Sequence, residues 1–205
     1  MHFVPNEVYH VYNRGNDKQP IFFNDKNYLY FLNKVREEWK LYCEILCYCL
    51  MPNHFHFMLT PNEEGCENLT LSGKSTHLQH LSKTIGKTLS SYTQAINIQN
   101  KTTGNLFQKK TKAKNLLSEN RIGNNMDNTD YFLTCFNYIH NNPLKAGLVN
   151  SLKDWKYSSF PDYYGSRNGT LCNRSLALKV LGLSESHFAN FNLADLDEAI
   201  IKRIF

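Results

Sequence analysis

The sequence lacks any apolar run that approaches the roughly 20 residues a helix needs to cross a bilayer. Its first residues also lack the basic segment and the apolar stretch of a secretory signal. We therefore expect a protein of the cytoplasm without a membrane-spanning segment.

The pattern of a disulfide scaffold is absent as well. The chain contains six cysteines, and their spacing fits neither a disulfide-rich domain nor a zinc knuckle. We interpret all six as reduced residues that mostly pack in the interior. Internal repeats and low-complexity tracts are lacking too. By contrast, 41% of the residues are hydrophobic and 13% are aromatic, which is enough to bury the core of a folded domain.

Acidic residues are scarce in one part of a chain whose net charge is +5. Residues 101–121 contain six basic side chains and only one acidic side chain, Glu119. Positive charge gathered in one segment is typical of a surface that binds a polyanion such as DNA. For this segment alone, a solvated basic face without a partner is the alternative.

The apolar periodicity predicts four strands and three helices. We expect strands at residues 8–12, 43–50, 54–60 and 105–114, helices at 26–41, 76–98 and 129–141, and polar loops at 61–72 and 115–129. The order is β-α-β-β-α-β followed by a helix. It predicts an α+β fold of the ferredoxin-like split βαβ type, with one antiparallel sheet and helices on one face. The last helix should end or kink at Pro143, because proline cannot continue the hydrogen-bond ladder.

A candidate metal site lies where an apolar stretch leads through Pro52-Asn53, a turn signal, into a strand that alternates histidine with phenylalanine. Side chains at positions i and i+2 of a strand share a face, so His54 and His56 project together, roughly 6–7 Å apart along the backbone. Two neighbouring imidazoles can chelate one divalent cation. Taken alone, two histidines on a half-exposed strand are an equally good interpretation.

A candidate nucleophile lies near the end of the predicted helix 129–141. Asn142 follows Tyr138 by four residues and shares its helical face. A tyrosine hydroxyl, with an unperturbed pKa of about 10, is a weak nucleophile, but it can attack a phosphodiester that a metal polarises. The histidine pair and the Asn142 amide oxygen could hold that metal, which is consistent with Mg²⁺ or Mn²⁺. Taken alone, core packing is the more common role for one of 12 tyrosines.

These motifs together resemble a known family. His54-Phe55-His56 is similar to the His-hydrophobic-His motif of the HUH endonucleases. Segment 138–149 resembles the nucleophile region of single-tyrosine transposases, in particular the REP-associated tyrosine transposases and their insertion-sequence relatives. Three further segments resemble other parts of the family pattern: 48–54, 104–108 and 155–163. The resemblance spans about residues 8–165.

The resemblance implies that Tyr138 is the nucleophile, which forms a 5′-phosphotyrosine link to DNA and releases a 3′-OH. It also implies that His54, His56 and Asn142 ligate the metal. The implied substrate is single-stranded DNA that folds into imperfect hairpins, which the enzyme would cleave and rejoin without ATP. The implied function is therefore that of a transposase, a metal-dependent DNA endonuclease and strand transferase.

Four basic residues are candidates for phosphate contacts, which position DNA but carry little sequence information. They are Arg14 in the turn after the first strand, and Lys110, Lys112 and Lys114, which share one face of the fourth strand by period two. His10, Tyr12 and Phe107 could stack on unpaired bases, although core packing is the more common role for Phe107.

We expect a transposase-like domain at residues 1–165 and a helical C-terminal extension at 166–205. Dimers of the insertion-sequence relatives can place the tyrosine helix against the partner's histidines, whereas REP-associated members can act as monomers. A homodimer is therefore an open alternative that the sequence does not decide.

Two other functions also remain open. One is a non-catalytic protein that binds DNA hairpins on the same fold, which the complete His-His-Tyr-Asn set disfavours because a pure binder needs no chelating pair. The other is a replication or mobilisation nickase of the HUH class, which segment 138–149 disfavours.

Overall fold

A computed structural model describes residues 1–71, 74–118 and 128–184. Its centre is an antiparallel sheet of four strands in the order β2-β3-β1-β6. The strands are β1 (Tyr9–Arg14), β2 (Cys43–Met51), β3 (His54–Pro61) and β6 (Lys112–Asn115). This order and the antiparallel pairing confirm the predicted ferredoxin-like arrangement.

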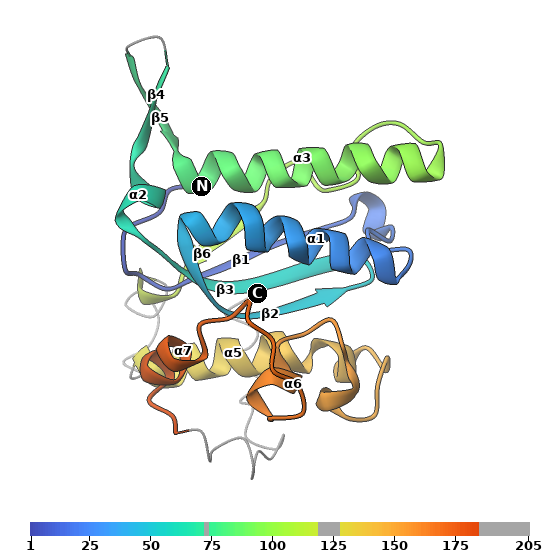
Figure 1. The fold of residues 1–205 in the computed structure, drawn as a ribbon, viewed down its shortest axis with the longest axis vertical. Helices are drawn as coiled ribbons and strands as arrows, with labels where there is room; N and C mark the ends of the chain where they lie inside the picture. Colours follow the sequence, from blue (N-terminus) through green and yellow to red (C-terminus); the bar gives the residue numbers. More distant parts are fainter. Residues whose placement is uncertain (72–73, 119–127, 185–205) are drawn as a thin grey trace.

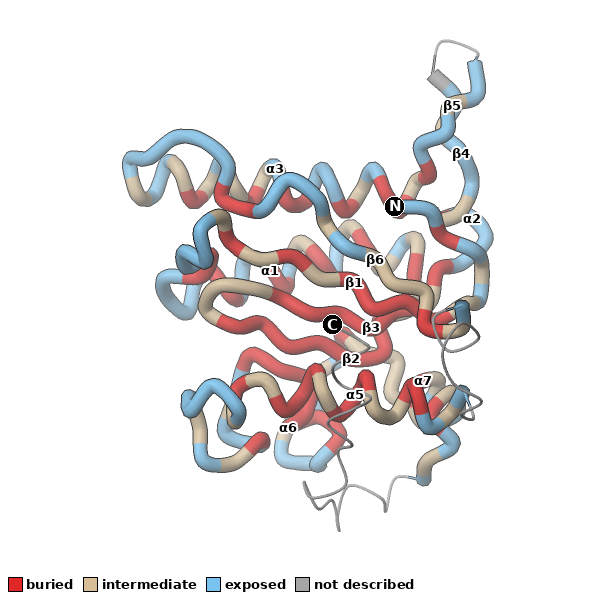
Figure 2. The backbone as a smooth tube through the Cα atoms, turned by 180° about the vertical axis from the view of Figure 1, so that it is seen from behind, coloured by how far each residue is buried: buried red, intermediate tan, exposed pale blue. Residues whose placement is uncertain are grey.

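Helices cover both faces of the sheet (Figure 1). The two helices inside the β-α-β-β-α-β unit, α1 (Asp25–Glu38) and α3 (His80–Asn100), lie on one face, as predicted. Helix α5 (Asn128–Lys145), which follows the unit, lies on the opposite face together with α6 (Phe160–Tyr163) and α7 (Arg174–Leu181). Each face therefore has its own apolar core, and the buried residues run through the sheet between them (Figure 2).

Helix α1 begins where the Asn24 side chain accepts a hydrogen bond from the Asn27 backbone N–H, as a helix N-cap does. It ends at Glu38 and passes into a short 3-10 turn at Trp39–Leu41. Trp39 is fully buried, and its indole N–H donates to the Thr88 hydroxyl of α3 at 3.0 Å. This contact holds the two helices together on the sheet.

The β2–β3 pair buries both of its faces. Phe55 and Phe57 of β3 point into the core beneath α1 and α3, whereas Cys47 and Cys49 of β2 point into the core beneath α5. A bulge between Ile45 and Cys47 adds one residue to β2, which shifts the alternation at that point. His54 and His56 alternate with the phenylalanines, so they lie on the α5 side of the sheet.

The segment before α3 differs from the prediction of a polar loop at 61–72 and a helix from residue 76. It forms a short helix, α2 (Glu63–Cys66), and a hairpin of β4 (Asn68–Leu71) and β5 (Lys74–Gln79) that projects from the body of the molecule (Figure 1). The buried Gln79 side chain bonds both the backbone N–H and the backbone C=O of Phe3, at 2.7 and 2.8 Å. These tertiary bonds hold residue 79 outside the helix, and α3 therefore begins at His80.

The fourth strand was predicted at 105–114, but β6 covers only Lys112–Asn115. The preceding segment pairs with the residue after β1 through an isolated bridge between Gly15 and Phe107. The Asn13 side chain donates to the Gln108 carbonyl at 3.2 Å and to the Thr111 hydroxyl at 3.0 Å. These side-chain bonds replace a regular ladder along this stretch.

Helix α5 continues beyond its predicted end, through Pro143 to Lys145. A proline at 143 cannot donate the backbone bond that the Ile139 carbonyl would otherwise accept. The Asn142 amide group supplies donors instead, to the Tyr138 carbonyl at 2.9 Å and to the Ile139 carbonyl at 3.4 Å. The helix therefore does not end at Pro143, which was one of the two predicted outcomes, because the Asn142 side chain supplies the missing donor.

The described part of the C-terminal extension contains α7, whose Ala177 and Leu181 share the core beneath α5. The rest of the predicted helical extension, residues 185–205, lies outside the described residues, as does most of the predicted loop 115–129. The domain boundary at residue 165 stays a prediction. Within the described parts of the chain, no helix combines the length and apolar character needed to span a membrane.

Candidate active site

The two histidines stand at the start of β3, just after the turn that joins it to β2. Their rings are nearly perpendicular, with centroids 4.9 Å apart. The pairing of β3 with β1 places Tyr12 opposite His56 and Arg14 opposite His54. Partners in an antiparallel ladder project to the same face. One end of the sheet therefore presents two imidazoles, a phenol and a guanidinium to the α5 side.

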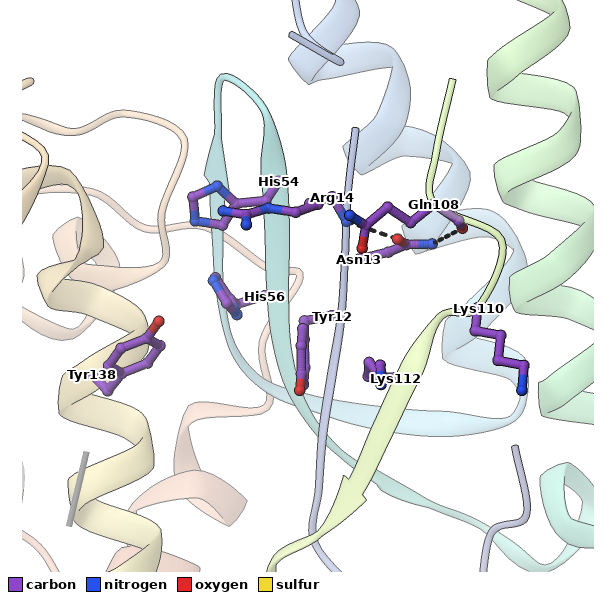
Figure 3. Close-up of a pocket in the computed structure, with 9 residues that line it drawn as sticks. All are labelled: Tyr12, Asn13, Arg14, His54, His56, Gln108, Lys110, Lys112 and Tyr138. Carbon is purple, nitrogen blue, oxygen red and sulfur yellow. Dashed lines mark hydrogen bonds between the residues drawn. The ribbon is translucent and has the colours of Figure 1, made fainter. Parts of the chain in front are cut away.

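Helix α5 brings Tyr138 and Asn142 to the same point. The Tyr138 ring lies 5.6 Å from the His56 ring, centroid to centroid, and it points from the helix toward the histidine strand (Figure 3). The Asn142 Oδ1 atom lies 3.5 Å from His54 Nε2. Four residues predicted from two distant motifs thus meet within one chain.

A pocket of about 270 Å³ opens at this point (Figure 3). It is lined by Tyr12, Asn13, Arg14, His54, His56, Gln108, Lys110, Lys112 and Tyr138. Three of the four predicted DNA-contacting residues are in this lining. The fourth, Lys114, lies farther along β6, opposite His10 of β1 in the strand register. It is not part of the pocket lining.

Burial keeps both histidines neutral. It lowers the pKa of His54 to about 4, with Arg14 acting in the same direction and the Asn142 hydrogen bond opposing it. Burial also holds the pKa of His56 well below its ordinary value, with further contributions from His10 and His54. At neutral pH each ring therefore has one nitrogen without a hydrogen, and the tautomer decides whether that nitrogen can bind a cation.

The Tyr138 hydroxyl is protonated at neutral pH. Burial raises its pKa to about 12, although a hydrogen bond from Asn142 and the charge of Arg14 act in the opposite direction. A partly buried phenol of this kind is a poor nucleophile on its own. It needs help from a charged group at the reacting phosphate.

The residues present fit a divalent cation. Two neutral imidazoles and an amide oxygen approach one another, and ligand atoms bound to one cation at about 2.0–2.2 Å lie roughly 3 Å apart. The 3.5 Å between His54 Nε2 and Asn142 Oδ1 is close to that spacing. In the described residues, no group of three His, Cys, Asp or Glu side chains could hold a metal, and the asparagine oxygen falls outside those four types.

Sequence reasoning was wrong about one neighbour of the site and did not find another. His10 is a predicted candidate for stacking on DNA bases, but it is fully buried beside Tyr12 and His56, with ring centroids 4.6 and 5.0 Å away. Phe107 is buried in the core, as the alternative for it stated. Asn53, read from sequence only as part of a turn, accepts from His54 at 2.6 Å. The position of Asn53 directly before the His54-Phe55-His56 motif was the one sequence signal that could have indicated this contact.

Of three comparisons with known proteins, one finds a match, and that match concerns the fold. No protein-family model matches the chain, and a sequence comparison with curated proteins finds no match. The structure matches a solved structure described as the REP-associated tyrosine transposase bound to a REP hairpin, with a TM-score of 0.57 and 17% sequence identity over 82% of this chain and 84% of that one. The predicted resemblance is thus confirmed at the level of the fold. The chain has the fold of a REP-associated tyrosine transposase.

Proposed function

We propose that this protein is a transposase-type endonuclease that cleaves and rejoins single-stranded DNA containing a hairpin. The observation that supports this most strongly is the meeting of Tyr138 with His54, His56 and Asn142 at one end of the sheet. Each of these side chains alone has a structural explanation. Together they supply a nucleophile and a set of metal ligands beside an open, basic pocket.

In the proposed reaction, the Tyr138 oxygen attacks the phosphorus of a phosphodiester. A bond forms between that oxygen and phosphorus, and the bond from phosphorus to the 3′ oxygen breaks. The phenol loses its proton, and the departing 3′ oxygen takes one up to become a 3′-OH. Because one phosphodiester replaces another, the reverse attack by a 3′-OH can rejoin the strand without ATP.

We assign the metal to His54, His56 and Asn142, with Mg²⁺ or Mn²⁺ as the cation. A bound divalent cation would supply the positive charge that polarises the phosphodiester and helps the phenol to ionise. The chain's own residues hold the phenol beside the phosphate position. Arg14 at the pocket adds a fixed positive charge for phosphate oxygens.

The DNA would enter along the basic side of the pocket. Lys110, which precedes β6, and Lys112, at the start of β6, line the pocket, and Lys114 lies farther along β6. The solved neighbour is described as bound to a REP hairpin, which supports a hairpin as the substrate class here. We place the protein in the cytoplasm, in keeping with its six free cysteines.

The proposed reaction is compatible with either a monomer or a homodimer in solution. The site does not need a second copy for its geometry, because Tyr138 lies against His56 of the same chain. We therefore propose that cleavage occurs within one copy. Mixing a Tyr138→Phe chain with a His56→Ala chain tests this, because a site shared between copies would regain activity and a site within one copy would not.

A covalent trapping experiment tests the function. Hairpin oligonucleotides labelled at either end are incubated with Mg²⁺ or Mn²⁺ and run on a denaturing protein gel. We expect an adduct that carries the label 3′ of the cut and that disappears with a chelator or with Tyr138→Phe. Tyr164→Phe, which changes an exposed tyrosine elsewhere, is the matched control and should form the adduct normally.

The alternative is a protein that binds hairpins without cutting them. Tight hairpin binding with no adduct under either metal would contradict the proposed catalysis and favour this alternative. An adduct that survives Tyr138→Phe would contradict the assignment of the nucleophile.

A further inference from the structure

We propose that Asn53 and His10 are positioning residues that hold His54 and His56 in the same tautomer, with hydrogen on Nδ1 and a lone pair on Nε2. This inference rests on the proposed function, because it concerns how the chain prepares its two histidines for a cation. Neither residue belongs to the predicted set of ligands. Both act through hydrogen bonds to the nitrogen that faces away from the proposed metal position.

The orientation of Asn53 is fixed by two contacts of opposite kind. Its Nδ2 atom donates to the Lys18 backbone carbonyl at 3.2 Å, and a carbonyl oxygen can only accept. The Oδ1 atom must then be the one that lies 2.6 Å from His54 Nδ1. An amide oxygen also only accepts, so the hydrogen of the neutral His54 ring is on Nδ1 and the lone pair is on Nε2.

The backbone reinforces this arrangement. The Asn53 carbonyl accepts from the Gly15 N–H at 2.8 Å, so residue 53 is tied to the segment after β1 at two points. Lys18 presents its carbonyl from a tight turn in which Asp17 and Lys18 both have positive φ, 50° and 60°. Non-glycine residues rarely adopt that conformation, so the turn must be held by its surroundings.

Asn142 is fixed in the same way on the other side of His54. Its Nδ2 atom donates to the carbonyls of Tyr138 and Ile139, so Oδ1 is the atom that faces His54 Nε2 at 3.5 Å. The Nε2 lone pair and the Oδ1 atom are both acceptors. Two acceptors that face each other at this distance repel, and a cation that binds both removes the repulsion.

His10 plays the corresponding part for His56. The His10 Nε2 atom lies 2.9 Å from His56 Nδ1, so one of these two nitrogens carries the shared hydrogen. If His56 donates, its Nε2 carries the lone pair and can bind a cation. If His10 donates, a neutral His56 has its hydrogen on Nε2 and cannot. Metal binding therefore requires His10 to accept, which is the usual role of the outer partner of a metal-binding histidine.

The packing holds His10 in place for this role. Its ring is fully buried, stacks on Tyr12 with an interplanar angle of 20°, and lies nearly in the plane of the His56 ring, with an interplanar angle of 18°, as an edge-to-edge hydrogen bond requires. All three residues stand on neighbouring positions of β1 and β3. The His10 ring thus cannot turn without disturbing the face of the sheet that carries the site.

The experiment measures Mn²⁺ affinity of the full chain by calorimetry, with no DNA present. We expect Asn53→Ala and His10→Phe each to weaken Mn²⁺ binding about 10–100-fold, because each removes an acceptor from a metal-binding histidine. His10→Phe keeps the stacked ring. Asn53→Asp and His10→Gln keep an acceptor and should restore most of the affinity. His77→Gln removes an exposed histidine on β5 and is the matched control.

The outcomes separate this inference from the proposed function. If the wild type binds no Mn²⁺, both are wrong. If the wild type binds Mn²⁺ and the alanine and phenylalanine variants bind it equally well, only the positioning role is wrong. Imidazole ¹⁵N shifts of the metal-free wild type give an independent test if a variant fails to fold. Hydrogen on Nε2 of either His54 or His56 would overturn the inference.

Discussion

The two faces of the central sheet are built from the same strands but differ in what they present. The face beneath α1 and α3 is packed with aromatic and aliphatic side chains, among them Phe55 and Phe57. The face beneath α5 is apolar under most of the helix, through residues such as Met58, and polar at one end, where His54 and His56 stand. Because β3 alternates between the two faces, one strand contributes both to the core and to the candidate site.

This difference indicates how the fold can hold a reactive site. The aromatic face fixes the backbone of β3, and the backbone fixes the direction of the histidines. Packing is close on the first face, with the Phe57 ring 5.0 Å from the Trp39 ring. On the second face, Asn53 and His10 lie within hydrogen-bond distance of the Nδ1 atoms of His54 and His56, and Asn142 Oδ1 faces His54 Nε2. We therefore expect stability to depend mostly on the aromatic face beneath α1 and α3. We expect the proposed DNA cleavage to depend mostly on the face beneath α5.

The largest expected effect is a loss of stability caused by a substitution on the aromatic face beneath α1 and α3. Phe57→Ala removes a fully buried ring and should lower the free energy of unfolding by about 3–5 kcal/mol, from lost burial and the cavity left behind. Urea unfolding followed by circular dichroism measures it. A loss below about 1 kcal/mol would contradict the stated division between the faces.

The matched change on the other face is His56→Ala, one position away on the same strand. It should abolish detectable adduct formation, a loss of at least about 100-fold, because it removes a proposed metal ligand. Its cost in stability should be well below that of Phe57→Ala. Adduct yield and urea unfolding of the two variants, measured side by side, provide the comparison. An active His56→Ala variant would remove His56 from the site.

The pH dependence of stability sharpens the contrast. Burial lowers the pKa of His54 to about 4 and of His10 to about 3, and holds that of His56 well below its usual value near 6.5. The unfolded chain therefore binds more protons below pH 6.5, and the metal-free protein should lose stability as the pH falls from 6.5 toward 4. Above pH 7 these groups should have no effect.

His56→Gln should make this acid dependence shallower, because it removes one buried imidazole. The exposed His77 provides the control, since His77→Gln should leave the slope unchanged. Urea unfolding at a series of pH values measures both. Equal slopes for the wild type and His56→Gln would show that His56 does not contribute to acid sensitivity.

The smallest expected effect concerns DNA. Lys112→Ala should weaken binding of a hairpin several-fold and lower the salt slope of the binding constant by about 1, because one phosphate contact is lost. Lys83→Ala, on the exposed side of α3 across the sheet, is the control and should change neither. Fluorescence anisotropy over a range of salt concentrations measures both. Equal effects of the two variants would mean that the basic pocket is not the DNA surface.

The sequence predicted the sheet topology, and local rules paired His54 with His56 by period two and Tyr138 with Asn142 by the i to i+4 relation. The meeting of the two pairs did not follow from spacing and was expected from the family resemblance and from the need of a tyrosine nucleophile for a metal. The sequence did not predict the features that depend on distant partners. The bonds from Gln79 to Phe3 turned an expected helical segment into strand β5. The burial of His10 likewise depends on strands that meet only in the folded sheet.

One measurement tests the central claim most directly. The protein is trapped on a hairpin oligonucleotide, the adduct is digested with a protease and a nuclease, and the modified peptide is sequenced by mass spectrometry. We predict a nucleotide joined through its 5′ phosphate to Tyr138. A nucleotide on any other residue, or none under either Mg²⁺ or Mn²⁺, would contradict the proposal that this site cleaves DNA.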